Sequence, residues 1–286
     1  MFAIGLRKAA TSWAAWLAVL AAIGLVVIAF SGQSGSGVTT KYRPLAATAG
    51  PVLNVRTDCG AAGNGSANDT PAINRCITMA NGAGPSGGTV EFPAGNYRAG
   101  GSIHMMSNVT LQLDSGSTIM GSSSGYDAAE ANPNSAFQDF GHSHFHDAMI
   151  WGDRLTNIGF TGSGTIDGGG HLITGNPGGG QADKIISLTR CDGLTVSGIT
   201  LRRGGHFAML INGCNHVTSD HLTIATASDR DGWNIISTRN VTITNITDAA
   251  NDDALVFKSD WALGPRSPTG TSPSATRTSR PAAATP

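Results

Sequence analysis

The chain has 286 residues, of which 39 are glycine, 13% are charged and 6% are aromatic, and its formal net charge is -1. A near-neutral chain with no basic run beyond Arg7-Lys8 lacks the electrostatic footprint of a nucleic-acid-binding protein. Many glycines with few charged and aromatic residues are typical of a protein with many tight turns and stacked aliphatic strands.

The N-terminal segment has the composition of an export signal. Arg7 and Lys8 precede an uncharged run over residues 13–30, and a Gly/Ser-rich stretch follows. This order predicts a signal over residues 1–31 and a flexible linker over 32–50. Two alternatives stay open: cleavage near residues 29–31, or a membrane anchor retained at 13–30, since such a run is long enough to span a bilayer. The protein is therefore expected to be secreted or anchored outside the cell.

A helix is predicted after residue 69. Thr70 can cap it, Pro71 suits the first helical position, and Ile73, Cys76 and Ile77 follow helical spacing. Glycines at 82 and 84 end the pattern. An amphipathic helix at this point is expected to cover the open end of the domain that follows.

An internal repeat runs through the second half of the chain. The leading apolar residues Leu194, Val217 and Val241 recur after 23 and 24 residues, and each begins a stretch in which apolar and small polar residues alternate. Four residues later stand Gly198, His221 and Asn245, types that tolerate positive φ at a corner. The pattern predicts a solenoid of short parallel strands over residues 51–262, with one strand edge of each coil paired to the next.

The four cysteines are disulfide candidates, because exported proteins commonly contain disulfides. Cys191 and Cys214 both stand three residues before the leading apolar residue of their repeats, so neighbouring coils would bring their Cα atoms to bonding distance. Stacked free thiols are the alternative. Cys59 lies in the loop before the predicted helix and Cys76 on its apolar face, which makes them the second candidate pair.

Two acidic clusters are separated by nearly one repeat. Asp231 precedes Asp253 by 22 residues, and Asp252 stands beside Asp253. If each repeat is one coil, Asp231 and the Asp252-Asp253 pair lie on neighbouring strands, about 4.8 Å apart. Carboxylates placed together in this way can divide acid and base work, whereas a solvated turn is the simpler explanation of the pair.

The sequence also resembles a known family. Its opening, Asn54-Val55 through Gly60-Ala-Ala-Gly-Asn-Gly65 and Gly88-Thr-Val-Glu-Phe-Pro-Ala-Gly-Asn-Tyr97, resembles that of pectin-degrading parallel β-helix enzymes. Asp231-Gly232 resembles the Asn-Thr-Asp-Gly motif of glycoside hydrolase family 28, the polygalacturonases. Asn251-Asp252-Asp253 through Lys258-Ser259 resembles that family's Gly-Asp-Asp…Ile-Lys-Ser motif. The resemblance implies an all-β, right-handed parallel β-helix.

It also implies a reaction. Asp252 would protonate the departing glycosidic oxygen while Asp231 and Asp253 activate water, with inversion at the sugar carbon. The substrate would be pectin or a related acidic polysaccharide, and Arg230 and Lys258 are candidate residues for binding its anionic sugars. The repeat itself adds His206 as a candidate substrate-binding residue, because it follows Leu194 by 12 residues, as Asp253 follows Val241, and is expected to line the same groove; a structural histidine is the alternative. No cofactor and no metal are expected, and the protein is expected to be monomeric.

The sequence departs from the family pattern at several points. The Asn-Thr-Asp motif here is Asp229-Arg230-Asp231, and because all eight histidines precede Leu222, the downstream His-Gly motif is absent. The Arg-x-Lys substrate motif is also absent. Residues 263–286 are rich in Pro, Ser, Thr, Arg and Ala, which predicts a disordered or out-of-frame tail, an incomplete β-helix and reduced activity.

Three histidines alternate at His142, His144 and His146. In a strand they would share one face and could meet a metal, but a polar surface strand or a wall of the substrate groove is the preferred interpretation. Two other functions remain open: a polysaccharide lyase on the same fold and a non-catalytic carbohydrate-binding β-helix.

Overall fold

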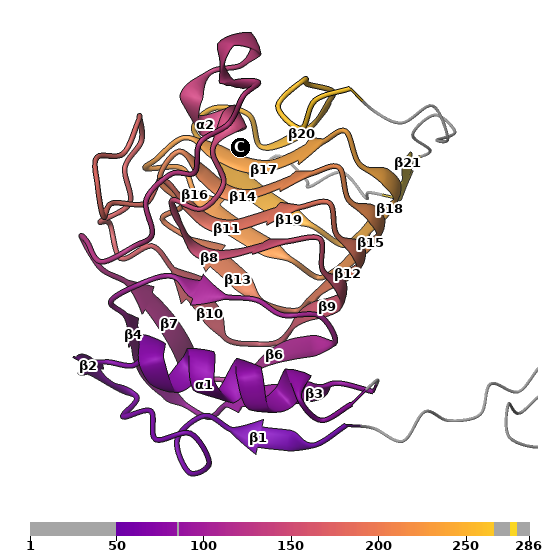
Figure 1. Ribbon diagram of the computed structural model, residues 1–286. Coiled ribbons are helices and arrows are strands. Elements are labelled where there is room, and N and C mark those ends of the chain that lie inside the picture. Colours follow the sequence, from indigo (N-terminus) through magenta and orange to yellow (C-terminus); the bar gives the residue numbers. More distant parts are fainter. Residues whose placement is uncertain (1–49, 85, 266–274, 279–286) are drawn as a thin grey trace, which may run out of the picture. The chain divides into compact units, whose positions relative to one another are not determined.

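The coiling of the chain follows directly from the repeat. The computed structural model describes residues 50–84, 86–265 and 275–278, and the described strands form three parallel sheets in a right-handed β-helix (Figure 1). Most coils supply one strand to each sheet, so consecutive coils stack by hydrogen bonding in the direction of the helix axis. The predicted fold is confirmed.

The first sheet has the strand order β1-β3-β6-β9-β12-β15-β18-β21. Its strands are β1 (Val52–Asn54), β3 (Gly88–Phe92), β6 (Val109–Leu113), β9 (Thr156–Gly162), β12 (Asp192–Ser197), β15 (Asn215–Asp220), β18 (Arg239–Thr244) and β21 (Ala275–Thr278).

The second sheet has the order β19-β16-β13-β10-β7-β4-β2. Its strands are β2 (Asn64–Asn68), β4 (Gly95–Ala99), β7 (Ser117–Gly121), β10 (Thr165–Asp167), β13 (Thr200–Arg202), β16 (Thr223–Thr226) and β19 (Thr247–Ala250).

The third sheet has the order β20-β17-β14-β11-β8-β5. Its strands are β5 (Ile103–His104), β8 (Ala148–Asp153), β11 (Lys184–Thr189), β14 (Phe207–Asn212), β17 (Asp231–Ile236) and β20 (Leu255–Lys258).

The predicted register of the repeat is also confirmed. Leu194 pairs with Val217 and Val217 with Val241, and all three side chains are buried in one inward column. The corner residues Gly198, His221 and Asn245 have φ values of 76°, 53° and 51°. The left-handed backbone conformation at this corner explains why glycine, histidine and asparagine occupy it in successive coils.

Helix α1 (Thr70–Asn81) lies across the first coil, beside β1 and β3 (Figure 1). Its buried face includes Ile73, Cys76 and Ile77, which pack into the same core as the strands, so its expected role of covering that end is confirmed. The predicted cap was wrong by one residue. Asp69 is the N-cap and its carboxylate instead accepts backbone N–H groups of the preceding loop, while the Thr70 hydroxyl donates to the carbonyl of Gly101.

Both cysteine pairs form disulfides. Cys59 is bonded to Cys76 with a Cα–Cα distance of 5.5 Å, and Cys191 to Cys214 with 4.4 Å. The first joins a loop to α1, and the second joins two neighbouring coils, as the repeat spacing predicted.

A long connection over residues 122–147 leaves the second sheet and returns to β8 across the outer face of the third sheet. It contains a 3-10 turn, η3 (Ser135–Phe137), and the short helix α2 (Phe140–Ser143). Phe145 from this connection packs with Phe207, Leu210 and Ile236 in a second apolar cluster outside the main core. The connection therefore covers the outer face of the third sheet at β14 and β17, which explains why every residue of these two strands is buried.

Several terminal predictions fall on parts of the chain outside the described residues. These are the signal or anchor over 1–31, nearly all of the linker over 32–50, and most of the tail over 263–286. Within the tail, residues Ala275–Thr278 form β21 and pair with β18 in parallel register, where a disordered segment was expected. In the described part of the chain, no helix has the length and apolar character needed to cross a membrane.

Candidate active site

The parallel register builds two columns of side chains where the strands of the third sheet begin. The first column is defined by the register of the strands and contains Ala148, Lys184, Phe207, Asp231 and Asp253. The second column contains the residue that precedes each of these, namely Asp147, Asp183, His206, Arg230 and Asp252. Except for Lys258, the candidate catalytic and substrate-binding residues lie in these two columns.

The three predicted acids meet at the last described coils. Asp231 is the first residue of β17, and the N–H of Gly232 donates to the carbonyl of Asp253 over 2.8 Å. Asp231 and Asp253 therefore occupy neighbouring strands, whose usual spacing is about 4.8 Å. Asp231 is 4% exposed, whereas Asp252 and Asp253 are exposed to solvent.

The environment of Asp231 changes its proton affinity. Burial raises the pKa of its carboxyl, and the negative charge of Asp252 raises it further. A hydrogen bond from Asn234 Nδ2 to Asp231 Oδ2, 3.0 Å long, and the charges of Arg230 and Lys258 oppose this rise without cancelling it. Among the described residues, Asp231 Oδ1 has no hydrogen-bond partner. One oxygen of this carboxyl is thus held by an amide, and the other is buried without a partner in this part of the chain.

Arg230 contacts side chains on both neighbouring coils. Its Nη2 atom lies 3.0 Å from Asp252 Oδ2, and its Nη1 atom lies 3.0 Å from His206 Nε2. The guanidinium therefore spans two coils and fixes the Asp252 side chain beside Asp231.

His206 lies one position away from its predicted place. It aligns with Arg230 and Asp252 and not with Asp253, because the turns between the strands differ in length. Burial, followed by the charges of Arg230 and Lys184, lowers the pKa of His206 to about 4. The ring is neutral at neutral pH and accepts a hydrogen bond from Arg230.

Lys258 is placed differently from the other candidates. It is the last residue of β20 and pairs with Ile236, at the opposite end of the strand from Asp253. Its charge reaches Asp231 and lowers the pKa of that carboxyl. Lys258 therefore lies along the same face as the acids and not next to them.

Three buried ionisable residues escaped the sequence analysis. The Lys184 ammonium is completely buried, contacts the carboxylate of Asp183 and lies 3.3 Å from Asp147 Oδ1. Burial raises the pKa of Asp183 to about 7, and the nearby Asp147 adds to that rise although Lys184 opposes it. Two carboxyl groups share one ammonium, so the group would carry a net negative charge if both were ionised. A proton retained on Asp183 removes this buried charge. Only the register of the coils could have shown that these residues meet.

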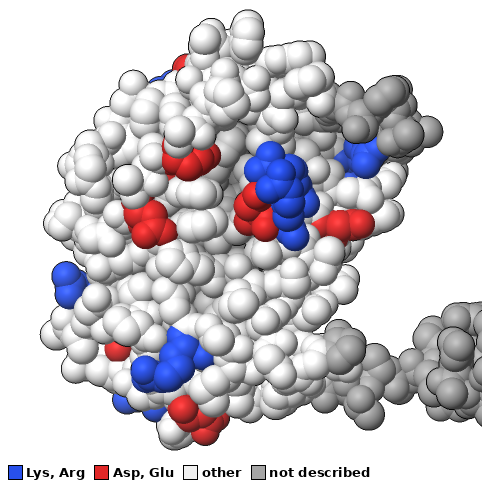
Figure 2. Space-filling view, in the orientation of Figure 1, with Lys and Arg blue, Asp and Glu red and all other residues white. Residues whose placement is uncertain are grey.

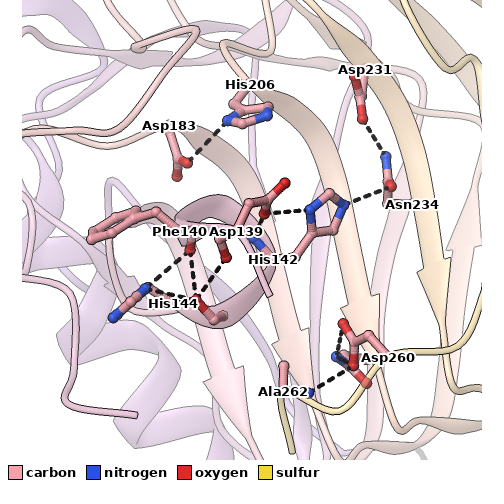
Figure 3. A network of polar contacts seen from close by, with 12 residues as sticks. Asp139, Phe140, His142, His144, Asp183, His206, Asp231, Asn234, Asp260 and Ala262 are labelled. Atoms are coloured by element: carbon pink, nitrogen blue, oxygen red, sulfur yellow. Dashed lines mark hydrogen bonds and ion pairs between the residues drawn. The ribbon is translucent and has the colours of Figure 1, made fainter. Parts of the chain in front are cut away.

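The histidines of the long connection do not share a strand face, and that prediction was wrong. His142 lies in α2 with its ring 5.0 Å from the Phe207 ring, His144 stacks on Phe140, and His146 stacks on Trp151. Residues 140–143 are helical because Asp139 caps them through the N–H of His142. Figure 3 shows His142 beside Asn234, whose amide in turn contacts Asp231.

The charged side chains on this side of the molecule do not form a single-sign patch. In the orientation of Figure 1, Lys and Arg side chains gather in a few small groups on a mostly uncharged face, and the largest of them lies against acidic side chains (Figure 2). Nothing on this face has the form of a basic stripe.

Gly232 follows Asp231 because a side chain would not fit. A Cβ atom at this position would lie 2.3 Å from the carbonyl oxygen of Ala254 and 2.4 Å from Asp248 Oδ1. We expect Gly232→Ala to lower the free energy of unfolding by ~1–3 kcal/mol, because the next strand must shift. Urea unfolding would measure this. Gly175→Ala is the matched control, since nothing lies within 4 Å of its Cβ, and an equal loss in both variants would contradict the steric explanation.

Asp248 occupies an inward position in β19, opposite the core residue Ile224. Neither of its carboxyl oxygens has a partner among the described residues, and burial raises its pKa to about 7. In the unfolded chain the proton leaves near the ordinary pKa of 3.8, so this group makes the fold progressively less stable as pH rises from about 4 to about 7.

We therefore expect Asp248→Asn to leave stability unchanged near pH 4 and to raise it above pH 7 by at least ~1.4 kcal/mol, the effect of one pKa unit. Urea unfolding at both pH values measures the change. A gain that is the same at every pH would show that Asp248 is ionised in the folded protein.

A family model described as "Rhamnogalacturonase A/epimerase, pectate lyase-like" matches residues 52–268. The protein named "Probable endo-xylogalacturonan hydrolase A" of Aspergillus fumigatus is 27% identical over 223 residues, in each of two strains. That match covers 72% of this chain and 50% of the relative, so the chain spans about half the length of the curated relatives it matches.

Solved structures of low sequence identity share the fold. The family 28 exopolygalacturonase of Yersinia enterocolitica superimposes with a TM-score of 0.57 at 21% identity, over 73% of this chain and 45% of that enzyme. The hyperthermoactive exopolygalacturonase of Thermotoga maritima gives a TM-score of 0.58 at 18% identity, over 73% of this chain and 55% of that enzyme.

Proposed function

Because the chain belongs to the rhamnogalacturonase A/epimerase, pectate lyase-like family, we propose that it is a glycoside hydrolase acting on pectin or a related acidic polysaccharide. The observation that carries this proposal is the position of Asp231 opposite the Asp252-Asp253 pair on neighbouring coils. Hydrolysis of a glycosidic bond needs two carboxyl groups, one protonated and one ionised, on opposite sides of the scissile bond.

In the proposed reaction, Asp252 gives its proton to the departing glycosidic oxygen. Asp231 and Asp253 accept a proton from water, which attacks the anomeric carbon as the bond to the leaving sugar breaks. One new hemiacetal and one free hydroxyl result, and the anomeric configuration inverts. The exposure of Asp252 and Asp253 supports this proposal, since both can meet a polymeric substrate.

A second candidate mechanism exchanges the roles, with Asp231 as the general acid, and one observation favours it. The pKa of Asp231 is raised by burial, as a general acid requires. Asp252, by contrast, is engaged by the Arg230 guanidinium, and that contact would have to open before Asp252 could donate a proton. In this alternative Asp231 protonates the leaving group and the exposed pair activates water.

The preference for an acidic polymer is proposed from the cations beside the acids. Arg230 lies against Asp252, and Lys258 lies further along the same strand face. A uronate carboxylate could exchange with Asp252 for the guanidinium, since bidentate contacts of this kind are strong. His206, which is neutral and bonded to Arg230, would hold the guanidinium in place.

We also propose that the protein is exported from the cell and is monomeric. Two disulfides are typical of proteins that fold in an oxidising compartment, which supports export. A monomer remains the expected state. The reduced activity predicted from the absent downstream motifs also remains a prediction.

The product of polygalacturonate cleavage tests the proposed class of reaction. A hydrolase releases reducing ends without forming a carbon–carbon double bond, and its activity survives a calcium chelator. An unsaturated product that disappears with chelator would establish a lyase instead. Binding of oligogalacturonate without release of reducing ends would establish a carbohydrate-binding β-helix.

A further inference from the structure

A chain of polar contacts leads from the long connection to Asp231. Asp139 Oδ1 lies 2.6 Å from His142 Nδ1, His142 Nε2 lies 3.3 Å from Asn234 Oδ1, and Asn234 Nδ2 lies 3.0 Å from Asp231 Oδ2. Figure 3 shows these four side chains in sequence. Asp139 and His142 therefore reach the acid from a segment about 90 residues earlier in the chain.

The directions of these hydrogen bonds follow from their end groups. The Asn234 Nδ2 group donates to the Asp231 carboxyl, so the opposite atom of the amide, Oδ1, can only accept. His142 Nε2 must then donate to it. At the other end Asp139 also accepts, because burial alone would raise its pKa, but the donors of His142 outweigh burial and lower it. The Asp139 carboxylate therefore holds one side of the His142 ring, while Nε2 on the other side faces Asn234.

The side chain of His142 is fixed in position by burial and by its contacts. Its side chain is 13% exposed, and its backbone N–H donates to the same Asp139 carboxylate over 2.9 Å. Its neighbour Gly141 lies flat against the sheet, since a Cβ there would be 2.9 Å from the Phe207 ring and 3.0 Å from the His206 ring. The absence of a side chain at Gly141 allows α2 to approach β14 and place His142 over Asn234.

We propose that His142 is a positioning residue for Asp231. It acts through Asn234: by donating to Asn234 Oδ1 it prevents the amide from turning over, so that Nδ2 always faces Asp231 Oδ2. The Asp231 carboxyl is thereby held in one orientation, with its buried Oδ1 atom left without a partner among the described residues. This inference deepens the proposed hydrolase function and rests on it only where activity is measured.

The charged and titratable groups around His142 come from three elements. Asp139 belongs to the cap of α2, His206 precedes β14 with its ring centroid 6.5 Å from that of His142, and Asp231 lies on β17 behind Asn234. His206 is neutral at neutral pH, and the hydrogen bonds from His142 lower the pKa of Asp139. Removal of His142 therefore takes away the contact that orients Asn234.

Three variants of the full chain test the proposal. His142→Ala removes the ring and its contact with Asn234, and His142→Gln keeps an amide donor that can reach Asn234. His146→Gln is the control, because His146 comes from the same connection but stacks on Trp151. On polygalacturonate we expect His142→Ala to lower kcat at least ~10-fold with little change in KM, His142→Gln to recover part of the loss, and His146→Gln to resemble the unsubstituted protein.

An NMR titration of the Asp231 carboxyl gives a second readout that does not require activity. We expect its pKa to rise in His142→Ala, since the Asn234 amide that donates to the carboxylate is no longer fixed, and to stay unchanged in His146→Gln. An unchanged titration in His142→Ala would overturn the proposed role of His142, whether or not the protein is active. Lack of hydrolysis by the unsubstituted protein, together with a shifted titration, would refute the proposed function and leave this inference standing.

Discussion

Asp252→Asn is expected to lower turnover of polygalacturonate by at least ~10², because general acid catalysis contributes about 10²–10⁴ to a rate. Asparagine has nearly the same shape and can still meet Arg230, so folding should be unaffected. The measurement is reducing-end release under conditions where the unsubstituted protein is active. Asp192→Asn is the matched control, because Asp192 is an exposed acid of the first sheet and is paired with His216.

The same variant separates the two assignments of acid and base. An aryl leaving group departs without being protonated. A substrate that carries one should therefore restore most of the activity lost in the variant that lacks the general acid. We expect this recovery in Asp252→Asn and not in Asp231→Asn. The opposite result would identify Asp231, whose pKa is raised by burial, as the proton donor. Near-normal hydrolysis by Asp252→Asn would remove Asp252 from the mechanism.

Lys184→Met is expected to produce the largest loss of stability, ~3–5 kcal/mol in the free energy of unfolding. Methionine fills a similar volume, but Asp147 and Asp183 remain buried without their shared cation. The loss should be greater at pH 8 than at pH 6. Asp183 has a pKa of about 7 beside Lys184, whose charge lowers it, so the pKa rises further in the variant. The variant then continues to lose stability between pH 7 and pH 8, where the unsubstituted protein has already released this proton.

Urea unfolding at the two pH values measures this effect. Arg154→Met is the control, because the Arg154 side chain is 69% exposed beside Asp153, and exposed pairs contribute only ~0–1 kcal/mol. Combining Lys184→Met with Asp147→Asn and Asp183→Asn should recover most of the lost free energy of unfolding. A small, pH-independent loss would show that the two carboxyls do not depend on Lys184.

The repeat made much of the fold predictable. The apolar positions at Leu194, Val217 and Val241 specified the register of the strands, and the register in turn predicted the pairing of Cys191 with Cys214. Once each coil is known to return to the same place, residues separated by one period must be neighbours. The resemblance to polygalacturonases that the motifs indicated agrees with the family match and with the fold of the solved relatives.

The parts that could not be predicted lie in the irregular connections. No periodicity relates residues 122–147 to the coils, so nothing in the sequence indicated that α2 would bring His142 over Asn234. The alternating histidines suggested a strand, but the Asp139 cap and the small Gly141 favoured a helical turn docked on β14. Turn lengths caused the smaller error at His206, which shifted by one residue from its expected column.

The buried charges were missed for a related reason. Lys184 and Asp183 stand in a stretch that resembles any polar strand end, and neither residue type signals burial by itself. Their meeting with Asp147 depends on two connections of different length that happen to begin their strands in register. Such contacts become visible only after the coils have been aligned in space.

The stereochemistry of the first product tests the central claim most directly. Proton NMR of polygalacturonate cleavage, recorded before the sugar anomers equilibrate, should show the inverted anomer at the new reducing end, and the signal should be lost in both Asp231→Asn and Asp252→Asn. A first product with retained configuration, an unsaturated product, or an unchanged signal in either variant would contradict the assignment of these carboxyls to inverting hydrolysis.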